Sequence, residues 1–174
     1  SEEPEPPAEP SADEADTART PIAAVAVLTA RAGGTVAGTV RFEQSGGETV
    51  LTADITGLEP GKNGFHIHET GDCSAPDFTS AGGHFNPLAT EHGSPGSGHI
   101  GDLGNLESDA DGNAQLRWSL AGELLSEGET SIIGRSVIVH EGEDDLTSQP
   151  SGDAGARLAC GVIELESPER PALR

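Results

Sequence analysis

Basic residues are scarce in this chain of 174 residues. Nine Lys and Arg stand against 30 Asp and Glu, the formal net charge is −21 at pH 7, and Lys62 is the only lysine. Nucleic acids are bound by clustered Lys and Arg, so the composition disfavours a nucleic-acid partner. The acidic excess is typical of a highly soluble protein, and a high-salt habitat is a second interpretation.

Long apolar runs are also missing, because no segment approaches the ~20 consecutive apolar residues that a membrane span needs. The first 18 residues contain seven acids, four prolines and no basic residue. They hold too few large apolar side chains to offset the entropy of ordering. We therefore predict a disordered acidic leader over residues 1–20, a folded domain over 21–166 and a short tail over 167–174. The leader suits a spacer from a lipidated N-terminus outside this chain, with an expression boundary as the alternative.

The chain has no CxxC spacing and only two cysteines, Cys73 and Cys160. Two cysteines so far apart, in a chain whose candidate metal ligands are histidines, predict one long-range disulfide. Two buried free thiols are the alternative. A disulfide indicates an oxidising compartment, so we expect the protein to be periplasmic, on the cell surface or secreted.

Helical periods of useful length are missing, and alternation with period two takes their place. Polar and apolar residues alternate in three segments, which predicts half-buried strands, and apolar segments predict three more. Gly-Gly and Asp-Gly pairs mark turns between them. This pattern favours an all-β antiparallel sandwich or barrel. The predicted strands lie at residues 22–31, 35–43, 51–56, 114–120, 137–140 and 158–165.

All six histidines lie in patterns typical of metal ligands. His66 and His68 are two positions apart on a predicted strand, so both imidazoles project from the same face. His140 ends an apolar strand and is a third ligand on a rigid element. Imidazole nitrogen is the commonest protein ligand for copper and zinc. One metal ion could take all three side chains.

A glycine-rich span over residues 71–104 is too long for an ordinary connection, and such loops are usually functional. It carries four more candidate ligands. A set of imidazoles with one carboxylate is typical of zinc. The histidine nearest the first group, His84, could serve either metal or both. The four candidates are His84, His92, His99 and Asp102.

Five ordered motifs resemble the copper/zinc superoxide dismutases, over roughly residues 22 to 164. The spacing of Cys73 after His68 is more similar to bacterial secreted members than to the animal enzymes. The resemblance implies a Greek-key antiparallel β-sandwich or flattened barrel, immunoglobulin-like, with eight strands and long metal-binding and active-site loops. The motifs are Gly64–Glu69, Gly83–Leu88, His99–Gly104, Gly134–Glu141 and Gly155–Ile163.

The resemblance also implies one copper and one zinc ion per chain. Arg157 would guide and hold the superoxide anion beside copper. Asp144 would link a copper-ligand and a zinc-ligand histidine, and Cys73 and Cys160 would form the family disulfide. The implied copper ligands are His66, His68, His84 and His140. The implied zinc ligands are His84, His92, His99 and Asp102.

The implied activity is superoxide dismutation, in which two superoxide anions and two protons give oxygen and hydrogen peroxide. Copper would be reduced and reoxidised in turn, zinc would be structural, and His84 would take a proton. Two other functions are a copper-binding or copper-delivery module without turnover and a structural zinc sandwich. A homodimer is a further partner that the sequence leaves open. The segment from Glu141 to Ala156 is short, with five acids and no lysine, and departs from the loop that steers substrate in the animal enzymes.

Overall fold

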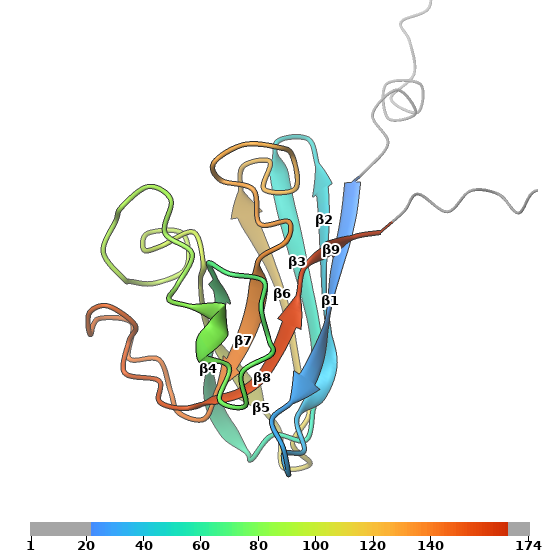
Figure 1. The fold of residues 1–174 in the computed structure, drawn as a ribbon, viewed down its shortest axis with the longest axis vertical. Coiled ribbons are helices and arrows are strands. Elements are labelled where there is room, and N and C mark those ends of the chain that lie inside the picture. The colour runs from blue at the N-terminus through green and yellow to red at the C-terminus, as the bar shows by residue number, and fades with distance from the viewer. Residues whose placement is uncertain (1–21, 167–174) are drawn as a thin grey trace, which may run out of the picture.

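The computed structural model describes residues 22–166 and folds them into antiparallel strands (Figure 1). The predicted leader and tail lie outside these described residues. The only helical element within residues 22–166 is the 3-10 turn η1 (Thr79–Ala81). No helix in this range is long and apolar enough to cross a membrane. The nine strands are β1 (Ile22–Ala30), β2 (Ala37–Ser45), β3 (Glu48–Thr56), β4 (Gly61–His68), β5 (Asp102–Ser108), β6 (Ala114–Ala121), β7 (Ser136–His140), β8 (Arg157–Val162) and β9 (Glu164–Leu165).

Eight of these strands follow one hydrogen-bonded path in the order β5-β4-β7-β8-β1-β2-β3-β6, and β9 pairs with β1. The end strands β5 and β6 approach each other, so the sheet is nearly closed into a barrel. The chain crosses the barrel between β3 and β4 and again between β6 and β7, because these consecutive strands are not neighbours. The predicted all-β fold class is confirmed.

Alternating side chains build the core, because successive residues of a strand point to opposite faces. Val40 and Phe42 of β2 are buried and pair with the buried Ala53 and Leu51 of β3. Trp118 of β6 shares the phase of buried neighbours but is 42% exposed. It lies on β6, the last strand of the hydrogen-bonded path through the described residues.

Two long loops lie on the same side of the barrel and place the candidate site (Figure 1). One joins β4 to β5 over residues 69–101 and contains η1; the other joins β7 to β8 over residues 141–156. The prediction that Asp102 belongs to the first loop is wrong, since Asp102 opens β5 and pairs with His66 of β4. Glycine is depleted in strands, so the glycines at the end of this span favour a loop in the sequence where the structure has the start of β5.

Candidate metal centre

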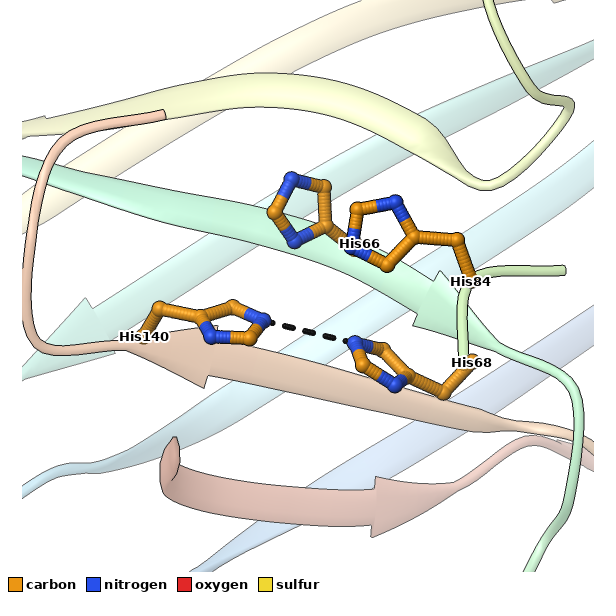
Figure 2. A group of neighbouring side chains, drawn as sticks. All are labelled: His66, His68, His84 and His140. Atoms are coloured by element: carbon orange, nitrogen blue, oxygen red, sulfur yellow. Dashed lines mark hydrogen bonds between the residues drawn. The ribbon is translucent and has the colours of Figure 1, made fainter. Parts of the chain in front are cut away.

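Four histidines from three parts of the chain converge on one point (Figure 2). His66 and His68 are on β4, and His140 is the last residue of β7, the neighbour of β4 in the sheet. His84 lies in the 69–101 loop and joins β4 through an isolated bridge to His68. Each ring offers one nitrogen, and these four atoms lie within 4.8 Å of one another.

Backbone carbonyls fix which nitrogen of His68 and His140 carries the proton. His68 donates from Nδ1 to the Gly82 carbonyl at 2.8 Å, and His140 donates from Nδ1 to the Gly155 carbonyl at 3.0 Å. Each ring therefore turns an unprotonated Nε2 toward the other, and these nitrogens are 3.3 Å apart (Figure 2). Two facing lone pairs repel, so the arrangement fits a cation between them.

His66 and His84 supply two further nitrogens to the same point. His66 donates from Nε2 to Asp144 at 2.5 Å, so its Nδ1 is unprotonated. His66 Nδ1 and His84 Nε2 are buried and have no hydrogen-bond partner among the described residues. Buried polar atoms without a partner are rare and costly. A bound metal ion is a partner that both atoms fit.

A second cluster lies on the other side of His84. Asp102 Oδ1 is 3.0 Å from His84 Nδ1 and 2.8 Å from His92 Nδ1, and His99 Nδ1 is 3.3 Å from His84 Nδ1. Asp102 Oδ2 accepts the backbone N–H groups of Gly93 and His99 at 3.1 and 2.7 Å. Three imidazoles and one carboxylate make a donor set typical of zinc.

Asp144 connects the two clusters through hydrogen bonds to one histidine of each. Its Oδ2 accepts from His66 and its Oδ1 accepts from His92 Nε2 at 2.7 Å. Asn105 holds Asp144 in place, because its amide donates to the Asp144 carbonyl at 2.9 Å and accepts the Asp144 N–H at 2.7 Å. Gln149 pairs in the same two-way manner with the backbone of His92. No sequence pattern points to Asn105 or Gln149, since both contacts join segments that are distant along the chain.

Burial keeps the rings of His66, His68 and His140 neutral. Loss of hydration lowers the pKa of His66 to about 4 and that of His140 to about 3, and it places the pKa of His68 well below its usual range. Burial also lowers the pKa of His92, but hydrogen bonds to Asp144 and Asp102 and the negative charges of these carboxylates outweigh it, so the pKa of His92 is raised overall. Neutral imidazole is the form that binds metal, so the rings of His66, His68 and His140 are prepared for a cation at neutral pH.

We expect the chelator-stripped protein to lose stability on acidification from about pH 6.5 to pH 4. The pKa values of His66, His68 and His140 are lowered by folding, so in this window the unfolded chain binds more protons than the folded one. His92 acts in the opposite sense, because stability from a raised pKa is present at low pH and is lost as the pH rises. The measurement is the melting temperature at several pH values, and His140→Gln should flatten the curve. A melting temperature that is constant or rises toward pH 4 would contradict this expectation.

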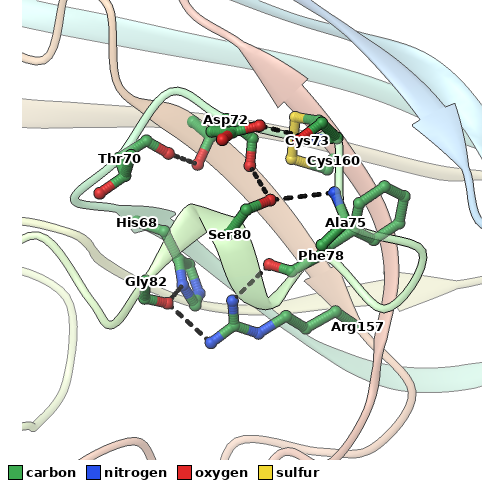
Figure 3. Close-up of a disulfide and its surroundings, with 12 residues drawn as sticks. His68, Thr70, Asp72, Cys73, Ala75, Phe78, Ser80, Gly82, Arg157 and Cys160 are labelled. Atoms are coloured by element: carbon green, nitrogen blue, oxygen red, sulfur yellow. Dashed lines mark hydrogen bonds between the residues drawn. A yellow bond between two sulfur atoms is a disulfide. The ribbon is translucent and has the colours of Figure 1, made fainter.

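Arg157 opens β8 and reaches the loop beside the first cluster (Figure 3). Its Nη1 and Nη2 donate to the carbonyls of Phe78 and Gly82, both at 2.7 Å. The Gly82 carbonyl is also the acceptor of His68, so one oxygen connects the guanidinium to the histidine cluster. A guanidinium has five N–H donors and stays cationic at any working pH, which leaves donors for an anion.

The predicted disulfide between Cys73 and Cys160 is confirmed, with a Cα–Cα distance of 5.7 Å (Figure 3). It ties the 69–101 loop to β8, three residues after Arg157. Phe78, Ala81 and Ile138 pack with the cystine in a small apolar cluster of their own. The disulfide therefore holds in place the loop segment whose carbonyl groups accept the hydrogen bonds of Arg157.

Reduction of the disulfide is expected to lower stability by about 4–5 kcal/mol, because the bond closes 87 residues of chain in the unfolded state. The measurement is thermal unfolding with and without reductant at constant metal content. The double variant Cys73→Ser, Cys160→Ser should melt where the reduced protein does. Equal melting of the oxidised and reduced forms, or two free thiols in the native exported protein, would exclude a stabilising disulfide.

The fold and the two clusters define a class of protein. A nearly closed antiparallel barrel that brings two ligand sets together, with one histidine shared between them, is suited to a two-metal centre. The sets are His66, His68, His84 and His140, and His84, His92, His99 and Asp102. The structure brings together the residues of the two ligand sets that the resemblance implied, and their roles as copper and zinc ligands stay a prediction.

Comparisons with known proteins give the family. The model of the copper/zinc superoxide dismutases matches residues 36–163. The extracellular Cu-Zn superoxide dismutase of Caenorhabditis elegans is 49% identical over 134 residues, which cover 72% of this chain and 60% of that protein. The Cu-Zn superoxide dismutase of Yarrowia lipolytica is 46% identical over 157 residues, which cover 83% of this chain and 98% of that protein. The chain belongs to the copper/zinc superoxide dismutase family.

The family match confirms the sequence-based assignment, and membership of this family implies copper and zinc as the metals. The expected likeness to bacterial secreted members stays a prediction, as do the homodimer and the lipidated N-terminus. The matched residues 36–163 lie inside the predicted folded domain.

Proposed function

We propose that the chain dismutates superoxide with one copper and one zinc ion, and that they share His84. The proposal rests above all on the position of the His84 ring. Its Nε2 faces the all-histidine cluster and has no hydrogen-bond partner in the described part of the chain, whereas its Nδ1 faces Asp102 at 3.0 Å. A donor set of four nitrogens suits copper, and a set with a carboxylate suits zinc. The family and the names of both relatives support the activity.

When bound, copper supplies the one-electron couple that superoxide needs in both half-reactions. The chain supplies the surroundings. Arg157 offers a fixed positive charge and free N–H donors for the anion, next to the carbonyl that orients His68. His84 Nε2 is buried, faces the cluster and has no hydrogen-bond partner among the described residues, so there it can take up one of the protons that dismutation consumes. Asp144 holds the rings of His66 and His92 in one orientation, which keeps the donor atoms fixed.

The test is elemental analysis of the reconstituted protein followed by superoxide disproportionation against a chelator-stripped control. We expect one copper and one zinc per chain and activity that depends on copper. Two metals without activity would favour a copper-binding or copper-delivery module. Zinc alone after full reconstitution would favour a structural zinc sandwich, and either result would reject the proposal.

We also propose that the protein works outside the cytoplasm. The Cys73–Cys160 bond supports this, because disulfides persist in oxidising compartments. The relative from Caenorhabditis elegans is named as extracellular. Fractionation of the producing cells checks the proposal, and a cytoplasmic pool with the cystine reduced would contradict it.

A further inference from the structure

Arg135 is a cation whose contacts the proposed chemistry does not use. It lies directly before β7 and is partly buried. Its Nε donates to the Ser131 carbonyl and its Nη1 donates to the Glu69 carbonyl, both at 2.8 Å. Its guanidinium carbon is 3.9 Å from the centroid of the Phe85 ring. The positively charged guanidinium of Arg135 therefore lies against two carbonyl oxygens and one aromatic face.

The two distant partners of Arg135 are the chain neighbours of proposed copper ligands. Glu69 follows His68, and Phe85 follows His84. The segments that carry these histidines meet through the isolated bridge between His68 and His84. Two further bonds support it, from Glu69 N–H to Gly83 at 2.9 Å and from Phe85 N–H to Ile67 at 2.8 Å. His84 has no regular strand of its own, so these contacts set its position.

The guanidinium of Arg135 is suited to hold these two segments together. The Phe85 side chain is buried, and a cation over an aromatic face is held more strongly where water is excluded. The planar group can stack on the ring and donate in its own plane to the Glu69 carbonyl at the same time, which an ammonium cannot do. Arg135 also precedes the strand that ends in His140, so three proposed copper ligands come from segments that it touches or begins.

We propose that Arg135 is a positioning residue of the metal centre. By holding the backbone after His68 and the ring after His84, it fixes the distance between these two histidines and the orientation of the shared His84 ring. This inference rests on the proposed function for the identity of the metals. Its test does not require superoxide turnover, because the position of His84 can be followed through metal affinity and the copper spectrum.

The experiment compares the metal-loaded protein with Arg135→Gln, Arg135→Lys and Phe85→Leu. Metal affinity is measured by chelator competition, and the geometry of the copper site by paramagnetic resonance and visible absorption. We expect Arg135→Gln to weaken metal binding roughly tenfold, which corresponds to about 1.4 kcal/mol, and to alter the copper spectrum. Phe85→Leu should change both in the same direction. The double variant should add little to the loss in Arg135→Gln, because the contact between Arg135 and Phe85 is already absent there. Arg135→Lys should restore only part of the loss.

Arg41→Gln is the matched control. Arg41 also makes two hydrogen bonds, to Glu43 and Glu166, and its removal changes the charge equally, but it lies on β2 away from the histidines. It should leave the metal affinity and the copper spectrum unchanged. A wild-type spectrum and affinity in Arg135→Gln, or losses no larger than those of Arg41→Gln, would overturn the proposal. If Arg135→Gln does not fold, Phe85→Leu and Arg135→Lys decide by the same measurements. A wild-type protein that binds both metals without turnover would reject the proposed function and leave this inference open to the same test.

Discussion

Replacing Arg157 by glutamate is expected to lower kcat/KM for superoxide by at least ~100-fold while the metal content stays the same. A donor that faces developing or bound negative charge in a site is worth about this much, and a carboxylate would in addition repel the anion. Arg157 is held by the carbonyls of Phe78 and Gly82, so its charge has a fixed place beside His68. Pulse radiolysis or a competition assay gives the rate constant, and elemental analysis gives the metal content.

The variant Arg117→Glu is the control for overall charge. Arg117 is an exposed residue of β6, outside both ligand clusters and both long loops, and its replacement changes the net charge by the same amount. It should leave the rate within about twofold of the wild type. Arg157→Lys should retain part of the activity, because the charge remains without the fork of donors. Equal rates for Arg157→Glu and the wild type would show that Arg157 has no part in the reaction.

Much of the fold could be predicted because alternation is a local property of the sequence. Val40 and Phe42 are two positions apart in one segment, as Leu51 and Ala53 are in the next, and all four are buried in the structure. The grouping of the histidines was also local in part, since His66 and His68 share one face of a strand. The shared role of His84 needed the resemblance, because its position in a long loop does not say which group it joins.

The residues that support the histidines could not be predicted, because each acts across the fold. Asn105 meets Asp144 from a distant strand, and Gln149 meets His92 from the other loop. Arg135 reads in the sequence as an exposed charge before a strand. Its partners, Glu69 and Phe85, become neighbours only when the 69–101 loop closes on the barrel. Such contacts depend on tertiary structure, which short-range periodicity does not encode.

Asp102→Ala is expected to release zinc, with affinity lower by at least ~100-fold. The loss of a group that only orients a ligand costs 10- to 100-fold, and Asp102 faces the metal site directly. Its Oδ1 lies 2.8 Å from His92 Nδ1 and 3.0 Å from His84 Nδ1, so the substitution removes the single carboxylate of that cluster. The same change leaves the N–H groups of Gly93 and His99 without their acceptor, which should loosen the loop.

Copper should be affected less than zinc by Asp102→Ala, because His66, His68 and His140 come from strands that do not depend on the carboxylate. Chelator competition with each metal in turn measures the two affinities. Asp102→Asn separates the two roles of the carboxylate, since an amide oxygen can still accept a loop N–H but brings no charge to zinc. Asp109→Ala is the control, because Asp109 also accepts two backbone N–H groups, those of Asp111 and Asn113, in a turn outside the centre. If Asp102→Ala bound zinc as tightly as Asp109→Ala, the assignment of zinc to this cluster would fail. If Asp102→Ala weakened copper binding more than zinc binding, copper would have to be assigned to the cluster that contains Asp102 and zinc to the all-histidine cluster.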